Sequence, residues 1–378
     1  MKPNSINLYV ILLLLAALIF SFLTIYSFGE EKERDFSVSG RSAVLYQPET
    51  GIFLYSKNAN ARLPMASTTK IMTALVALES CDFEEIVEIG EESVNIEGSS
   101  AYLKAGEKLT MEELLYALLL QSANDAATAI AYHVGGSIEV FSDLMNEKAK
   151  SFGLQNTHFT NPHGLDNEEH YTTARDLSII TAKALENESF KQIVSTYKKT
   201  FATDNRSRTY VNHNKMLRMY EGCIGVKTGF TTKSGRCLVS AAERDGLMFI
   251  SVTLDAPNDW KDHKAMLDLG YQSLVKISLA DPKEYCYKIP VINGEKDFIT
   301  VKNPLGASVI LENKEHAENC YLKLVKYAIA PINEGDILGE IIFTVDGKSE
   351  AKLSLVAEEN VLVKKEKGIL RRFLSLFN

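Results

Sequence analysis

Cysteine is scarce in this chain, and no two cysteines form a recognisable pair. The 378 residues include five cysteines and no C-x-x-C motif, so their spacing indicates neither a zinc site nor a redox centre. An odd and sparse count in a chain of this length also argues against a disulfide framework. We therefore expect Cys81, Cys223, Cys237, Cys286 and Cys320 to be buried residues that fill space in the core rather than reactive thiols.

An excess of positive charge is also missing. The chain has 41 Lys and Arg against 49 Asp and Glu, a formal net charge of -8. This balance gives no general reason to expect nucleic-acid binding. Internal repeats and low-complexity tracts are absent as well, and 46% of the residues are hydrophobic. Such a chain is long enough and apolar enough to fold into two domains, each with its own core.

One long apolar run stands at the amino terminus. Leu8–Phe28 is almost unbroken apolar sequence, and about twenty helical residues match a hydrocarbon core of about 30 Å. Lys2 precedes the run and the net-negative segment Glu30–Asp35 follows it, which places the bulk of the chain outside the cytoplasm. We expect residues 1–29 to be a signal peptide or an uncleaved membrane anchor, and the protein to be extracytoplasmic.

The middle of the chain mixes helical and strand patterns. Residues 42–46 and 52–55 predict a hairpin, and Thr110–Glu113 matches a capping box that opens an apolar helix through Leu120. Further helices are expected at Ser137–Phe152, from Thr173 and near Asp259–Val275, and further strands at Cys237–Ala242 and Met248–Leu254.

The last quarter of the chain changes character. Residues 282–363 alternate apolar and polar side chains, as in Cys320–Leu324, and contain a D-G turn at Asp346-Gly347. This pattern predicts a small all-β domain over 282–363. The tail at 364–378 then combines six apolar residues at helical spacing with five basic residues, which is typical of a helix at an anionic membrane surface. A helix docked on the β domain is the alternative.

Three short motifs carry the candidate chemistry. Ser67-Thr68-Thr69-Lys70 places a serine and a lysine on one face of a helix. A serine hydroxyl needs a base, and a lysine can be that base only when neutral, which burial and a neighbouring cation favour. Ser122-Ala123-Asn124 follows at the end of the apolar helix, and Lys227-Thr228-Gly229 lies near the end of a strand. Each motif alone also fits a solvated helix face, a helix end or a hairpin turn.

The order S-x-x-K, S-x-N, K-T-G resembles the signature of penicillin-recognising serine acyltransferases. Residues 63–75, 156–166 and 225–231 resemble the nucleophile helix, a loop and the substrate strand of the D-alanyl-D-alanine carboxypeptidase branch of the low-molecular-mass penicillin-binding proteins. The resemblance implies a β-lactamase-like catalytic domain over 38–277, with helices around an antiparallel sheet, followed by the all-β domain. It also implies β-lactam binding, peptidoglycan stem peptides ending in D-Ala-D-Ala as substrates, and no cofactor.

The same resemblance implies a catalytic set of three residues. Ser67 attacks the carbonyl between the terminal D-alanines, Lys70 takes the serine proton, and Ser122 relays a proton to the leaving amine. Asn124 binds the peptide side of the substrate, and Lys227 helps to keep the base neutral. The implied substrate-binding residues are Asn124, Lys227, Thr228, Gly229 and Phe230, with Thr228 on the terminal carboxylate and the Phe230 and Ser67 N–H groups as oxyanion hole.

Several alternatives stay open at this point. His213 stands where some family members place an arginine, which leaves an endopeptidase side activity open. His158, His163 and His170 cluster in one loop, but their spacing fits no H-E-x-x-H motif, so we expect structural histidines and no metal. A β-lactamase that uses Glu168 or Glu169, and a non-catalytic wall-binding scaffold, are the competing functions. A zinc peptidase lacks ligands at usable spacing.

Overall fold

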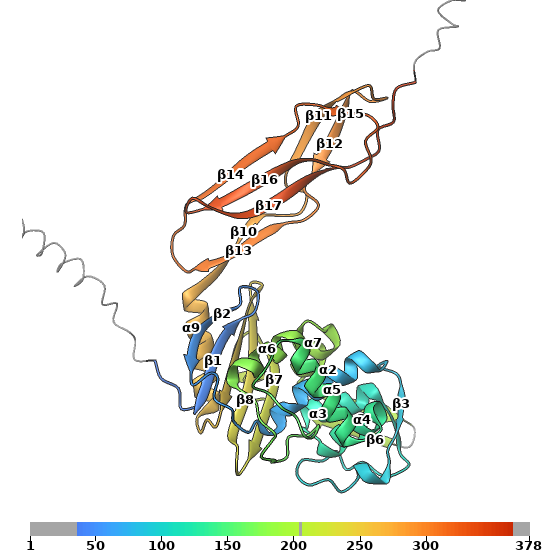
Figure 1. Cartoon of the computed structure of the whole chain (residues 1–378), viewed down its shortest axis with the longest axis vertical. Helices are drawn as coiled ribbons and strands as arrows, with labels where there is room; N and C mark the ends of the chain where they lie inside the picture. Colours follow the sequence, from blue (N-terminus) through green and yellow to red (C-terminus); the bar gives the residue numbers. More distant parts are fainter. Residues whose placement is uncertain (1–35, 204–205, 366–378) are drawn as a thin grey trace, which may run out of the picture. The chain divides into compact units, whose positions relative to one another are not determined.

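The computed structural model describes residues 36–203 and 206–365 (Figure 1). The expected signal or anchor at 1–29 and nearly all of the expected amphipathic tail lie outside these residues. Within the described ranges, no helix combines the length and the hydropathy that a membrane span requires.

A five-stranded sheet organises the catalytic part of the chain. Its strand order is β2-β1-β9-β8-β7, and every neighbouring pair is antiparallel. The expected hairpin and strands are confirmed. The strands are β1 Ser42–Gln47, β2 Ile52–Lys57, β7 Cys223–Thr231, β8 Gly235–Arg244 and β9 Leu247–Leu254.

Both faces of this sheet are covered, as β9 shows. Ile250, Val252 and Leu254 join the main apolar core, whereas the intervening Ser251 and Thr253 hydrogen-bond His263 of α9. Because successive strand side chains point to opposite faces, helices must lie on both sides of the sheet. This explains why β9 is apolar or buried almost throughout rather than alternating with exposed residues.

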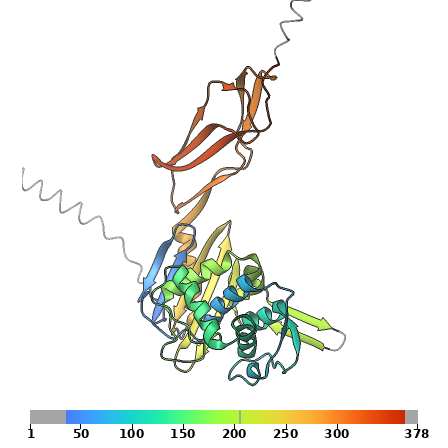
Figure 2. The same ribbon diagram turned by 45° about the vertical axis from the view of Figure 1, so that its right-hand side comes forward.

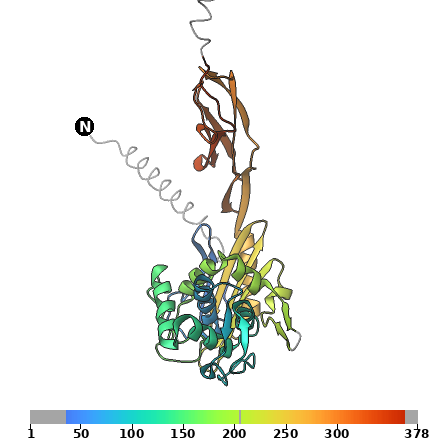
Figure 3. The same ribbon diagram turned by 90° about the vertical axis from the view of Figure 1, so that its right-hand side faces the viewer.

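The helices begin where the sequence supplies caps. Thr110, Ser137 and Thr173 each accept a hydrogen bond from the backbone N–H three residues later, so the three predicted starts are confirmed. The helices are α2 Lys70–Ser80, α3 Met111–Leu120, α4 Asn124–Gly135, α5 Ile138–Ser151, α6 Ala174–Leu185, α7 Glu188–Ser195, α8 Met216–Met219 and α9 Asp259–Ser273. Figure 3 shows them from a second side.

Short elements complete this part of the chain. A 3₁₀ turn, η1 Ala66–Thr69, runs directly into α2. β3 Ile86–Glu88 pairs with β4 Lys108–Thr110, and the turn η2 spans Glu91–Ser93. β5 Lys198–Thr203 and β6 Arg206–Val211 form a hairpin at the edge of the helical region (Figure 2).

The C-terminal part is all β, as predicted. A six-stranded sheet has the order β14-β16-β17-β12-β11-β15, β10 pairs with β13, and the domain has its own apolar core. The predicted D-G turn joins β16 to β17, with Asp346 and Gly347 both at positive φ. The strands are β10 Leu274–Ala280, β11 Cys286–Ile292, β12 Phe298–Lys302, β13 Ala307–Glu312, β14 Glu318–Leu324, β15 Ala328–Ile329, β16 Ile337–Val345 and β17 Lys348–Ala357.

All five cysteines are free thiols. Cys237 is buried as expected, but the expectation of buried filler is wrong for Cys286 and Cys320, which are exposed. Both stand in strands of the C-terminal domain whose side chains alternate or face solvent, so an apolar-looking residue there gains little burial.

Candidate active site

The nucleophile segment is a tight turn at the start of α2. Ser67 lies in η1, and Lys70 is the first residue of α2. Ala66 has a left-handed φ of 46°, and the loop residue Gly164 packs directly on it. A Cβ at Gly164 would lie 2.0 Å from the Ala66 oxygen, so only glycine allows this close contact. The loop at residues 156–166 thus fixes the turn that presents Ser67.

Lys70 is fully buried and is surrounded by three oxygen atoms. Its Nζ lies 3.0 Å from Ser67 Oγ, 2.7 Å from Asn124 Oδ1 and 2.6 Å from the backbone oxygen of His163. Burial first, and then the positive charge of Lys227, hold the pKa of Lys70 well below its ordinary value. The negative charge of Asp125 opposes this shift of the Lys70 pKa without reversing it.

The three oxygens around Lys70 can accommodate either charge state of its amine, since an ammonium donates to all three of them. Neutral lysine has two N–H donors and one lone pair. The Asn124 side-chain oxygen and the His163 carbonyl can only accept hydrogen bonds, so they use the two donors. In the neutral form, the lone pair of Nζ is left for the Ser67 hydroxyl, whose oxygen lies 3.0 Å from Nζ and 3.5 Å from the His163 oxygen.

The Ser-x-Asn motif lies between two helices. The sequence placed it at the end of the apolar helix, but α3 ends at Leu120 and Asn124 begins α4. Ser122 occupies the connecting turn with a left-handed φ of 61° and is buried. A non-glycine residue in this conformation costs about 1–3 kcal/mol, and such strain clusters at functional sites. Asn124 also donates from Nδ2 to the Glu97 oxygen at 2.5 Å.

The K-T-G motif lies on β7, next to the nucleophile turn. A Cβ at Gly229 would stand 3.1 Å from both the Ser67 nitrogen and the Met65 oxygen, so glycine lets the strand approach η1. Lys227 is buried beneath the strand, and its Nζ donates to the Thr228 oxygen at 2.9 Å. Burial lowers the pKa of Lys227 to about 7.

A cavity of about 400 Å³ opens above these residues. It brings five of the predicted residues to its wall: Ser67, Ser122, Thr228, Gly229 and Phe230. The other three, Lys70, Asn124 and Lys227, are buried side chains that do not line it. Glu168 and Glu169 are exposed and are also not among its lining residues.

Sequence reasoning missed several lining residues. Arg236 Nη2 donates to both carboxylate oxygens of Asp259 at 2.9 and 2.8 Å, and its guanidinium lies 5.7 Å from the Trp260 ring centroid. Arg236 reaches the cavity because the tight turn after K-T-G joins β7 to β8 and places Arg236 opposite Phe230. Asp259 and Trp260 belong to α9, and no motif near them in the sequence indicates that they line the cavity. The remaining missed residues are Ser99, Lys215 and Cys237.

The histidines near the site are held by hydrogen bonds. His170 lies 2.8 Å from Thr69 Oγ1, and the backbone oxygen of His163 contacts Lys70. Burial lowers the pKa of each of these two histidines to about 3, so both are neutral at physiological pH. His213 lines the cavity, where burial and the Lys227 charge lower its pKa.

Comparison with known proteins places the chain in a family. Residues 29–258 match the D-alanyl-D-alanine carboxypeptidase family of serine peptidases, and residues 276–362 match the penicillin-binding protein 5 C-terminal domain. The chain belongs to the D-alanyl-D-alanine carboxypeptidase family. The carboxypeptidase DacF of Bacillus subtilis is 34% identical over 334 residues, which cover 85% of each chain. DacC of Escherichia coli is 30% identical over 92% of this chain and 90% of its own length.

Solved structures agree with this family membership. Penicillin-binding protein 5 of Haemophilus influenzae superimposes with a TM-score of 0.63 and 26% identity, covering 86% of this chain and 98% of its own. The predicted fold and the predicted resemblance are confirmed. The protein is a serine-type D-Ala-D-Ala carboxypeptidase that acts on peptidoglycan, as the motifs implied. Its family consists of exported cell-wall enzymes whose ligands are D-Ala-D-Ala peptides and penicillin.

Proposed function

We propose that Ser67 is the acylated nucleophile of this carboxypeptidase and that neutral Lys70 is its base. The supporting observations are the complete burial of Lys70, which favours the neutral amine, and the 3.0 Å contact between its Nζ and Ser67 Oγ. Removing the serine proton activates an otherwise weak nucleophile. Burial and Lys227 keep the amine available for this step by lowering the pKa of Lys70.

The proposed reaction has two stages. Ser67 Oγ bonds to the carbonyl carbon between the terminal D-alanines while its proton passes to Lys70. Ser122, at the cavity wall, relays this proton from Lys70 to the leaving nitrogen, so D-alanine departs, Lys70 is neutral again and an ester on Ser67 remains. Water then cleaves the ester, which releases the shortened stem peptide with a new carboxyl group and restores the Ser67 hydroxyl.

The oxyanion and the substrate carboxylate need separate partners. We assign the oxyanion to the backbone N–H groups of Ser67 and Phe230, where one donor is worth about 3 kcal/mol. The close approach of β7 to η1 at Gly229 supports this assignment. We assign the terminal carboxylate to Thr228, and the absence of a side chain at Gly229 leaves room for it. Asn124 and Lys227 support the substrate site from beneath its wall.

Replacing Lys70 by arginine tests the base. Arginine keeps the positive charge but cannot deprotonate in a protein, so Lys70→Arg should abolish acylation by benzylpenicillin at neutral pH. Lys183→Arg, at an exposed lysine of α6 that does not line the cavity, is the control and should acylate normally. Substantial acylation of Lys70→Arg would show that another group takes the proton.

We also propose a membrane-associated, extracytoplasmic enzyme. In this proposal, residues 1–29 are the signal or anchor, 38–277 the catalytic domain, 282–363 the β domain and 364–378 an interfacial helix. The apolar run and the basic amphipathic tail in the sequence support it, as does membership in a family of exported cell-wall enzymes. Its partners are stem peptides, β-lactams and an anionic membrane surface.

A further inference from the structure

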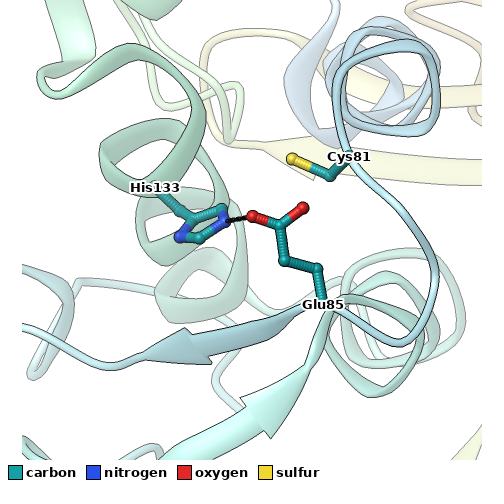
Figure 4. A group of neighbouring side chains, drawn as sticks. All are labelled: Cys81, Glu85 and His133. Atoms are coloured by element: carbon teal, nitrogen blue, oxygen red, sulfur yellow. Dashed lines mark hydrogen bonds and ion pairs between the residues drawn. The ribbon is translucent and has the colours of Figure 1, made fainter.

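Three side chains that can bind metal meet at a place that is not part of the active-site cavity. Cys81, Glu85 and His133 point toward one another, as Figure 4 shows. Their ligand atoms all lie within 4.8 Å of one another, and His133 Nε2 is 2.8 Å from Glu85 Oε1. None of the three lines the cavity that holds Ser67.

The backbone holds each of these residues in place. Cys81 follows the last residue of α2, and its N–H donates to the Ala77 oxygen at 3.0 Å. His133 lies in the last turn of α4. Glu85 lies in the connection between α2 and β3, where its backbone oxygen accepts a hydrogen bond from the Met111 N–H at 2.8 Å. The cluster is therefore built by three anchored segments.

The donor set suits zinc. Thiolate sulfur, imidazole nitrogen and carboxylate oxygen are the three ligand types of tetrahedral zinc sites, with bonds of about 2.0–2.3 Å. Ligand atoms of such a site are roughly 3.5 Å apart, so the present spacing requires only small side-chain rotations. A thiolate and a carboxylate would also neutralise the charge of a divalent cation.

The surrounding structure favours a cation at this point. The C-terminal ends of α2 and α4 both lie here, and a helix C-terminus carries partial negative charge. Asp82 adds a further negative charge beside Cys81. In the metal-free protein the Glu85 carboxylate is the hydrogen-bond partner of both Cys81 and His133, so a cation would replace the protons that now bridge the cluster.

We propose that Cys81, Glu85 and His133 bind one zinc ion, with water as the fourth ligand, and that this ion ties α2 to α4. Binding forms three bonds from the ion to the protein, displaces all but one of the waters of the hydrated ion and releases the Cys81 thiol proton to solvent. The N-terminal ends of the same two helices carry Lys70 and Asn124, which are hydrogen-bonded to each other. The ion therefore stabilises the helix pair that supports the first two motifs, and it takes no part in the chemistry.

Cobalt spectroscopy tests the site on the full chain, purified without a histidine tag, reduced and metal-free. Titration with Co²⁺ should produce a thiolate-to-cobalt charge-transfer band that saturates at one ion, and Zn²⁺ should displace it. Cys81→Ser should lose the band and at least about tenfold in Zn²⁺ affinity. Cys320→Ser, which removes an exposed thiol of the C-terminal domain, is the matched control and should keep both.

Stability gives the second measurement. Zn²⁺ should raise the thermal unfolding temperature of the wild type but not that of Cys81→Ser or His133→Gln. Stoichiometric acylation by penicillin shows that each variant is folded, independently of the metal. A band that persists in Cys81→Ser or disappears in Cys320→Ser would overturn the proposal, as would a wild type that binds neither cation at millimolar concentration.

Discussion

The side-chain oxygen of Asn124 accepts a hydrogen bond from Lys70 at 2.7 Å. This contact joins the beginning of α4 to the beginning of α2, and thus the second motif to the first. An amide oxygen orients the amine without the negative charge that would favour an ammonium ion. The identity of residue 124 therefore influences both the position of Lys70 and its proton affinity.

Replacing Asn124 by aspartate should make Lys70 a poor base. A carboxylate at this distance stabilises the ammonium form, which raises the pKa of Lys70. We expect benzylpenicillin acylation of Asn124→Asp to fall about 100-fold at neutral pH and to recover partly at higher pH. Asn124→Ala, which adds no charge, should slow acylation without shifting the acid limb of the pH–rate profile to higher pH. An unchanged pH–rate profile in Asn124→Asp would contradict this role.

Removing the charge of Lys227 should move the acid limb of acylation to higher pH. Lys227 lowers the pKa of Lys70 through charge repulsion, so Lys227→Gln allows Lys70 to hold its proton at higher pH. Because the pKa of Lys227 is about 7, the difference should be largest below about pH 7, where Lys227 carries its charge. Stopped-flow acylation across pH measures this acid limb, with Lys183→Gln, at an exposed lysine away from the cavity, as control. A shift of the acid limb to lower pH in Lys227→Gln would contradict the prediction that Lys227 lowers the pKa of Lys70.

The motifs and their order predicted the fold class, and five of the eight residues they indicated lie at the wall of the cavity that contains Ser67. Local signals such as the cap at Thr110 were also readable, because they depend on hydrogen bonds between near neighbours. The break before Asn124 could not be predicted, since only the partly buried Gln121 separates the buried side chains of α3 from those of Ser122 and α4. Arg236 and the zinc ligands depend on strand register and on packing between distant segments, which spacing in the sequence does not encode.

The buried His263 should make the catalytic domain less stable as the pH falls. It lies between Ser251 Oγ at 2.8 Å and Thr253 Oγ1 at 3.0 Å, and burial lowers its pKa to about 3. The unfolded chain takes up the proton below about pH 6.5 and the folded chain does not, so stability is lost as the pH falls below that value. From pH 7 to 5 the loss is about 2 kcal/mol.

Substitution of His263 by glutamine should flatten this dependence. Glutamine can still hydrogen-bond the two hydroxyls but does not titrate. Denaturant unfolding at pH 7 and pH 5 measures the free energy of unfolding in both proteins. We expect the wild type to lose about 2 kcal/mol more than His263→Gln between these values. Parallel losses in the two proteins would mean that His263 is protonated in the folded state.

Deleting residues 366–378 should release the enzyme from anionic membranes. Burial of six apolar side chains in the membrane contributes about 1.5–3 kcal/mol for each side chain that is fully buried. The entropy lost when the tail becomes ordered reduces this sum, but enough remains for reversible membrane binding. The five basic residues of 364–378 add an attraction that weakens with salt. A chain that begins at Asp35 should bind anionic vesicles at low salt, and its truncated form should not. Both should release D-alanine from a soluble peptide equally well.

Equal partition of the two forms onto vesicles would show that the tail is a docked structural helix. Vesicles of neutral lipid provide the control for charge, since the intact form should bind them less tightly than anionic ones.

The most direct test of the account is to locate the penicillin adduct on the full chain. Benzylpenicillin should acylate Ser67 alone, because it is the hydroxyl that shares a hydrogen bond with the neutral amine of Lys70. Trypsin separates this serine, on peptide 63–70, from Ser122, on peptide 109–148. Mass spectrometry should find one adduct, on peptide 63–70, and none in Ser67→Ala. An adduct on peptide 109–148, or no adduct on the wild type, would contradict Ser67 as the nucleophile.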